Sequence, residues 1–217
     1  TNPISEQLMD RLAFVRSSKD TKDWNIRYEP DHFFVETCEE IVVDDKPYAD
    51  TLYNHQGDHF TAESVVKTYY IQVNVKGIEY IKSAYSLQTG MAGSVQLCDQ
   101  SMVAEPPASV FFHMKPGADK TRESDDIAVA YATFNTFGKL KDVEGFIEVT
   151  FEFNTVFETT QVETIRLTDM FETPQVKNEQ WIIIDKVIEI VPPEGASTGG
   201  LNPGLSDWDE IEGETTI

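Results

Sequence analysis

The stretch TYYIQVNVK, residues 68–76, decides the fold class. Apolar or aromatic side chains occupy every second position, with mostly polar side chains between them: Tyr69, Ile71, Val73 and Val75. A period of two places each set on its own face of a β-strand, whereas a helix would mix them. Gly77 follows directly, and glycine is typical of a turn. The stretch therefore predicts a strand with one buried face.

The same period recurs in later runs, each of strand length and with Gly or Pro turns near several of their ends: residues 110–114, 127–132, 147–154, 162–167 and 181–191. Strands of this kind with no helical stretch between them are typical of an antiparallel β-sandwich. We therefore expect an all-β chain whose main domain spans residues 66–191. Four side chains are expected in its core and three on its surface: Ile71, Val73, Val149 and Phe151 inside, and Gln72, Glu148 and Glu152 outside.

The rest of the chain divides into two further parts. Residues 1–65 carry strand-like alternation around residues 24–28 and 33–37, too little for a closed sandwich. They predict a partial N-terminal β domain, completed by residues outside this chain or formed as a small sheet against the second domain. Residues 192–217 combine a Pro/Gly linker with an acidic tail. We expect residues 195–204 to be mobile and Trp208 to be partly buried, since an exposed indole is unfavourable.

Composition limits the partners. The 217 residues include 17 Lys and Arg against 38 Asp and Glu, a formal net charge of −21. Such a surface repels phosphate, so nucleic acid and anionic lipid headgroups are not expected as partners. No apolar run reaches the ~18 residues of a membrane-spanning helix. An apolar fraction of 40% with 13 Phe and 8 Tyr is too high for a disordered chain.

Few residues suggest chemistry. A histidine could act as the base of a hydrolase, but the sequence contains no GxSxG nucleophile elbow. The four histidines are therefore interpreted as polar surface side chains: His32, His55, His59 and His113. His55 and His59 have a spacing that could hold a metal on a helix, but Gly57 between them indicates a turn. The pairs Asp44-Asp45 and Asp125-Asp126 are interpreted as solvated loops, with weak calcium binding as the alternative. We therefore predict no catalytic, cofactor-binding or metal-binding residues, and no enzymatic activity.

Two further features leave alternatives open. Cys38 and Cys98 lie sixty positions apart, and we expect separate thiols rather than one disulfide. The pairs Tyr69-Tyr70 and Phe111-Phe112 could suggest a carbohydrate platform. Adjacent residues of a strand face opposite ways, so each pair would place one ring in the core and at most one outside. Core packing is therefore the favoured interpretation for most of these rings.

Several segments resemble a known family: TYYIQVNVKGIEYIKSA at 68–84, LQTGMAGSV at 87–95, TFNTFG at 133–138 with the strand after it, and the C-terminal linker with its acidic tail. They are similar to the fimbrial anchor lipoproteins of the Bacteroidales, the FimB-related minor fimbrial subunits. The resemblance covers about residues 45 to 217, and its motifs follow one another in the same order as in the family.

The resemblance implies a two-domain, transthyretin-like β-sandwich protein with a short first domain. It further implies a surface-exposed location at the cell outer membrane, through a lipidated N-terminal Cys absent from this chain. Such a protein would act in cell adhesion, anchoring or ending a fimbrium by strand exchange with pilin subunits. The resemblance does not separate an anchor from a tip or accessory subunit. The alternative is a carbohydrate- or host-ligand-binding surface lipoprotein that does not polymerise.

Overall fold

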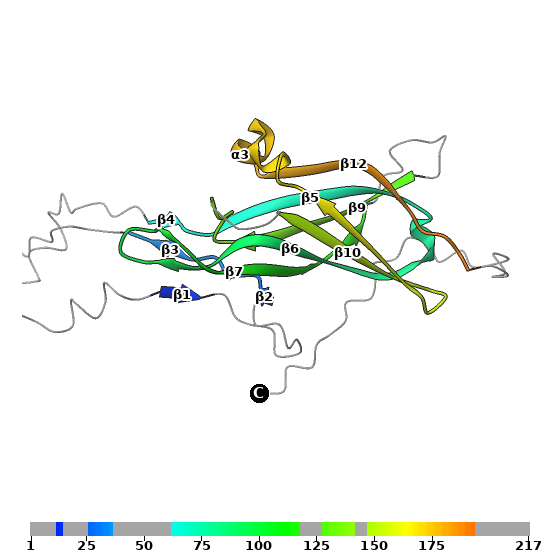
Figure 1. Ribbon diagram of the computed structural model, residues 1–217, viewed down its shortest axis with the longest axis horizontal. Helices are drawn as coiled ribbons and strands as arrows, with labels where there is room; N and C mark the ends of the chain where they lie inside the picture. Colours follow the sequence, from blue (N-terminus) through cyan, green and yellow to red (C-terminus); the bar gives the residue numbers. More distant parts are fainter. Residues whose placement is uncertain (1–11, 15–25, 37–61, 118–126, 142–146, 194–217) are drawn as a thin grey trace, which may run out of the picture.

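The computed structural model describes residues 12–14, 26–36, 62–117, 127–141 and 147–193 (Figure 1). The fold is mostly β, and its strands are β1 (Leu12–Phe14), β2 (Ile26–Tyr28), β3 (Phe34–Val35), β4 (Glu63–Ser64), β5 (Lys67–Lys76), β6 (Ile81–Gln96), β7 (Met102–His113), β8 (Lys115–Pro116), β9 (Ile127–Thr136), β10 (Glu148–Thr155), β11 (Thr160–Arg166) and β12 (Trp181–Glu189). Three short helical segments join them: the 3-10 helices η1 (Ile78–Tyr80) and η2 (Met170–Glu172), and the α-helix α3 (Pro174–Glu179).

Two sheets contain most of the described strands. The larger sheet has the order β11-β10-β6-β7-β2, and β1 pairs with the far end of β6. The smaller sheet has the order β12-β5-β9-β8, while β3 and β4 form a separate pair. Most neighbouring strands run antiparallel, as the sequence predicts.

Two pairings are parallel, which corrects the expectation of a purely antiparallel fold. Strand β12 pairs in parallel with β5, and β2 pairs in parallel with β7. Parallel neighbours need a long crossover connection rather than a tight turn. The strands β5 and β12 are separated by most of the domain, and the chain enters β12 through η2 and α3. Helical segments therefore do occur between predicted strands, where the sequence analysis expected none.

One apolar core lies between the inner faces of the two sheets. It contains side chains of β5, β9 and β12 from one sheet and of β6, β7 and β10 from the other. Phe112 of β7 stacks on Phe134 of β9 with ring centroids 4.4 Å apart, which joins the two sheets directly. Phe151 and Phe153 of β10 stack on each other in the same core and are fully buried. Burial of this aromatic and aliphatic surface supplies the main stabilisation of the fold.

The burial predictions are confirmed for the core and only partly for the surface. Ile71, Val73, Val149 and Phe151 are all fully buried. The three side chains expected at the surface are instead half-buried: Gln72, Glu148 and Glu152. Tyrosine hydroxyls bond to two of them: Tyr70 of the same strand donates to Gln72, and Tyr85 of the neighbouring strand β6 donates to Glu152.

A smaller apolar cluster lies at the far end of the β6–β7 hairpin. It contains Val65, Val66, Ala92, Val95, Phe137 and Leu140, with Val35 packed against it. Among the described parts of residues 1–65, β1 and β2 join the larger sheet and β3 pairs with β4. The division of the chain at residue 65 stays a prediction, as does the boundary at residue 192.

The structure places no described helix that is long and apolar enough to cross a membrane. The predicted linker from Gly195 and the indole of Trp208 lie outside the described residues, so both tail predictions stand as predictions.

Candidate functional site

Three aromatic rings line up across the outer face of the smaller sheet. Tyr70 of β5 lies between Trp181 of β12 and Tyr131 of β9, with centroid separations of 5.8 Å and 6.0 Å respectively. The register explains this row, because Trp181 lies directly opposite Tyr70 and Tyr131 lies opposite Gln72, two residues further along β5. Neighbouring strands are ~4.8 Å apart, so the row is roughly 10 Å wide.

Two of these rings, Tyr70 and Trp181, border a hollow of about 430 Å³, which we call the aromatic hollow. Its lining combines two aromatic rings with hydroxyl, amide and carboxylate groups: Thr68, Tyr70, Gln72, Thr133, Glu179 and Trp181. The indole of Trp181 is 50% exposed, so its ring faces solvent. A concave site with apolar walls and a few polar groups is the usual form of a small-ligand pocket.

The end of α3 positions one wall of the aromatic hollow. Thr173 caps the helix by accepting a hydrogen bond from the Val176 N–H. Gln180 then ends the helix in the left-handed conformation with φ 57°, and its carbonyl accepts a 2.9 Å hydrogen bond from the Tyr70 N–H. Glu179 and Trp181 flank this residue in the chain and both line the hollow, where α3 meets the start of β12 (Figure 1).

Hydrogen bonds orient the polar lining. The Tyr70 hydroxyl donates to Gln72 Oε1 at 3.1 Å, and the Thr68 hydroxyl donates to Asn135 Oδ1 at 2.7 Å. Burial raises the pKa of Tyr70, and the nearby Tyr131 hydroxyl raises it further. The Tyr70 phenol therefore stays neutral at physiological pH and remains a hydrogen-bonding group.

The outer face of the larger sheet carries a second aromatic cluster with a different character. Phe111 of β7 contacts Tyr85 and His113, both with centroids 5.2 Å away. The Tyr85 hydroxyl donates to Glu152, and burial together with this carboxylate raises the pKa of Tyr85 to about 12. Its polar atom is thus already engaged within the protein.

The outer strands β11 and β12 lie together on one side of the fold, here called the β11/β12 side. Side chains bridge the two sheets across it: Gln161 of β11 donates to the Glu189 carbonyl at 2.9 Å, and Lys186 of β12 donates to Glu163. β12 also has a register irregularity between Ile184 and Val187. Charged side chains and bulges on an outer strand hinder pairing with another chain.

The opposite side, here called the β7/β9 side, has much shorter outer strands. β7 has 12 residues and β9 has 10, yet β2 pairs with β7 over three residues and β8 pairs with β9 over two. Within the described ranges, no strand pairs with β9 beyond Tyr131 on this side. The Asn135 N–H there donates instead to the Glu29 carboxylate at 2.8 Å. Burial raises the pKa of Glu29, while this hydrogen bond opposes the rise.

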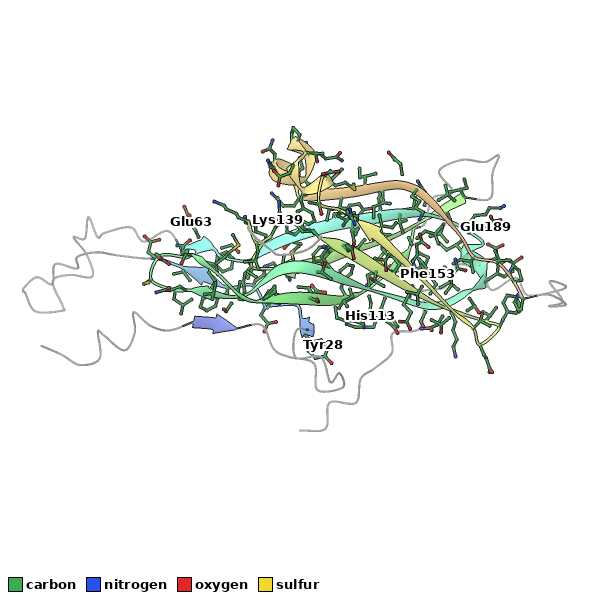
Figure 2. The ribbon with its side chains drawn as sticks, in the orientation of Figure 1. Tyr28, Glu63, His113, Lys139, Phe153 and Glu189 are labelled. Atoms are coloured by element: carbon green, nitrogen blue, oxygen red, sulfur yellow. The ribbon has the colours of Figure 1, made fainter. Side chains whose placement is uncertain are left out.

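The segment of residues 26–36 runs along the β7/β9 side. It starts as β2 on β7, reaches Asn135 of β9 through Glu29, and places Val35 against the smaller apolar cluster. Three large apolar side chains of this segment face solvent: Tyr28 at 39%, Phe33 at 38% and Phe34 at 59% exposure. Figure 2 shows Tyr28 and Glu189 far from each other, at the two different sides of the fold. Three exposed large apolar side chains within one short segment are compatible with an interaction surface.

The structure places the predicted chemical residues as follows. His32 is exposed, and His113 is half-buried against Phe111. Cys98 is half-buried in the turn after β6. Other candidates lie outside the described residues: Cys38, Asp44, Asp45, His55, His59, Asp125 and Asp126. Within the described ranges, no three His, Cys, Asp or Glu side chains gather as a metal site.

The aromatic pairs behave as their spacing predicts. Tyr69 and Phe112 are buried, whereas Tyr70 and Phe111 lie half-buried on the outer faces. The sequence analysis did not predict that Tyr70 meets Tyr131 and Trp181. The signal for that meeting is the register between three strands distant in sequence, which alternation within each strand does not contain.

No protein-family model and no curated protein matches this chain. A crystal structure of a “putative adhesin” from Bacteroides ovatus is similar to it, with a TM-score of 0.50 and 18% sequence identity. The match covers 85% of this chain and 69% of that chain. At this identity the comparison shows a likeness of fold.

Proposed function

We propose that this protein is a surface adhesion protein that holds or caps a fimbrium by non-covalent strand pairing. In this proposal its partners are fimbrial subunits, its location is the surface of the outer membrane through a lipid anchor, and it carries out no chemistry of its own. The short outer strands of the β7/β9 side are the observation that carries the proposal. Within this proposal, the protein could be the anchor, the tip or an accessory subunit of the fimbrium.

The fold supports this proposal at the level of architecture. Two sheets around one core are compatible with a transthyretin-like β-sandwich, which is the finer fold that we propose. The similar structure from Bacteroides ovatus is named a “putative adhesin”, and adhesion is therefore the first function to test for this chain. Adhesion by backbone pairing needs no catalytic residues.

The β7/β9 side supports pairing with another chain. A partner strand gains affinity from main-chain hydrogen bonds along an outer strand, and alternate side chains give specificity. Beyond Tyr131, β9 offers such an outer edge, where the Glu29 carboxylate stands in for a strand carbonyl at Asn135. The exposed Phe33 and Phe34 lie in the adjoining segment and would contribute apolar contact. On β7, β2 already pairs with Ser109–Phe111, and Pro106 and Pro107 before that stretch lack N–H donors, so β9 is the strand on this side that offers the pairing edge.

Deletion of the gene tests the function directly. We expect cells without it to release their fimbriae or to carry fimbriae of altered length, as seen by electron microscopy, and the wild-type gene should restore them. Complementation with F33S/F34S should fail, whereas the control V162S, an exposed position of β11 on the other side, should succeed. Fimbriae that stay attached after deletion, with unchanged length and amount, would contradict the proposal and favour a ligand-binding surface lipoprotein.

A further inference from the structure

We infer that the aromatic hollow on the outer face of the smaller sheet binds a neutral oligosaccharide. The hollow includes the side chain of Thr133 of β9, whereas strand pairing would use the backbone edge of that strand. Saccharide binding and fimbrial attachment are measured separately, so either proposal can fail without the other. The occupant follows from three properties of the described residues: the exposed ring faces, the polar groups beside them, and the sign of the local charge.

The ring faces give the first argument. A sugar ring has a face of C–H groups and a rim of hydroxyls, so it matches a site with flat aromatic walls and polar neighbours. Trp181 leaves half of its surface exposed although it lies at the start of a strand with a fully buried Ile182. Tyr70 supports the indole from the side, at a 50° angle between the rings. The two rings therefore form a bent wall rather than a flat packed surface.

The polar groups give the second argument. The hydroxyls of Thr68 and Thr133, the amide of Gln72 and the carboxylate of Glu179 line the same hollow. Together they offer donors and acceptors at short range, as hydroxyl-rich ligands require. The Thr68 hydroxyl and Gln72 Oε1 already bond to Asn135 and Tyr70, which orients them, and the remaining lone pairs and the Gln72 amide N–H groups can bond to ligand hydroxyls.

The charge gives the third argument. Glu179 is the charged side chain that lines the hollow, and no Lys or Arg is among the described lining residues. The formal net charge of the chain is −21. Sulfated or uronic saccharides would therefore be repelled, whereas a neutral saccharide would not. The volume of about 430 Å³ lies within the range of small-molecule sites and suits a short saccharide rather than a protein surface.

The preorganised wall limits the entropic cost of binding. The Tyr70 N–H bond to the Gln180 carbonyl fixes the end of α3 against β5, and the Thr173 cap fixes its start. The backbone that carries Glu179 and Trp181 is therefore held in place without a ligand, which favours affinity.

Calorimetric titration of the purified full chain tests this inference. The probes are cellohexaose, maltohexaose, laminarihexaose and mannohexaose, with hexa-galacturonate as the anionic comparison. We expect at least one neutral hexasaccharide to bind and the anionic one not to bind. W181A should weaken binding roughly tenfold or more, since the loss of a stacked ring approaches the ~1.4 kcal/mol of a tenfold change. W181F should restore part of the affinity.

The matched control is F111A, which removes a half-buried ring from the outer face of the larger sheet. It should leave the affinity unchanged, and circular dichroism should show that all variants keep the β fold. Three results would overturn the inference: no binding by any neutral probe at millimolar concentration, equal binding by W181A, or preferred binding of the anionic probe. Sedimentation that shows a dimer lost in W181A would also overturn it and identify the hollow as a contact between copies.

Discussion

The two sides of the fold close the same core in different ways. On the β11/β12 side, outer strands of seven and nine residues extend along their neighbours, and side chains bridge from sheet to sheet. On the β7/β9 side, the outer strands have three and two residues, and a carboxylate occupies one backbone donor of β9. Apolar side chains are exposed along the second side in a segment of largely irregular chain.

In our proposal, this difference separates the side that stabilises the fold from the side that binds a partner. A long outer strand pairs along its whole neighbour, and charged side chains with ion pairs to the other sheet hinder the addition of a further strand. A long strand whose outer edge is covered by short pieces retains backbone groups for a partner, at the risk of unwanted association. The comparison therefore predicts that changes in the core affect both sides equally, whereas changes at the edges affect only one.

The largest expected effect comes from the shared core. Phe134→Ala on β9 and Phe151→Ala on β10 each remove a fully buried ring. Each should lower the free energy of unfolding by about 3–5 kcal/mol, because a cavity replaces the ring. Urea denaturation measures both. A loss below about 1 kcal/mol for one variant would mean that its ring is not tightly packed in the core between the two sheets.

The next effect concerns the carboxylate on the β7/β9 side. Glu29→Gln keeps an oxygen that accepts the Asn135 N–H and removes a desolvated charge, so the stability at pH 7 should equal or exceed that of wild type. Glu29→Ala removes the acceptor and should be less stable than Glu29→Gln by about 0.5–1.5 kcal/mol. Equal stability of the two variants in urea would show that this hydrogen bond does not hold the segment on β9.

The same carboxylate gives a pH signature. Burial raises the folded-state pKa of Glu29 above 4.5, so the folded protein binds this proton more tightly than the unfolded chain. Its contribution to stability is fully present below the unfolded pKa and is lost as the pH rises through the folded pKa. Wild type should therefore lose stability relative to Glu29→Gln as the pH increases from about 4.5, in paired urea titrations. A constant difference across this window would contradict the burial of Glu29.

The smallest effect is expected on the β11/β12 side. Lys186→Ala removes the ion pair with Glu163, whose two side chains are both substantially exposed. Exposed ion pairs contribute about 0–1 kcal/mol, so stability should change little. Added salt should reduce the difference between variant and wild type. A loss above about 2 kcal/mol would mean that this bridge, rather than the core, holds the two sheets together.

Strands were predicted correctly from the sequence where every second side chain is apolar and buried. A strand with polar side chains in the core was not recognised. β5 and β10 bury every second side chain, and both were predicted. β6 is the longest strand and was not, since it buries Ser86 and Gln88 while Tyr85 and Leu87 lie outward. In β9, the core receives the small side chains of Ala128, Ala130 and Ala132, opposite large rings that fill the space. Packing against the facing sheet determines which side chains of β6 and β9 enter the core, and the sequence of a single strand does not contain this information.

The candidate sites depend even more on tertiary structure. The sequence contained the residues of the aromatic hollow, but three strands and the end of α3 bring them together. The parallel placement of β12 beside β5 decides that Trp181 meets Tyr70. A purely antiparallel order, as first expected, gives no reason for this contact.

Site-specific photo-crosslinking in fimbriated cells tests the central claim most directly. A benzoylphenylalanine replaces Lys115, an exposed residue of β8 on the β7/β9 side, or Val162, an exposed residue of β11 on the other side. We predict that irradiation joins the Lys115 variant to a fimbrial subunit identified by mass spectrometry, and that the Val162 variant gives no such product. Adducts from Val162 alone, or none from either position while fimbriae are present, would contradict strand pairing at the β7/β9 side.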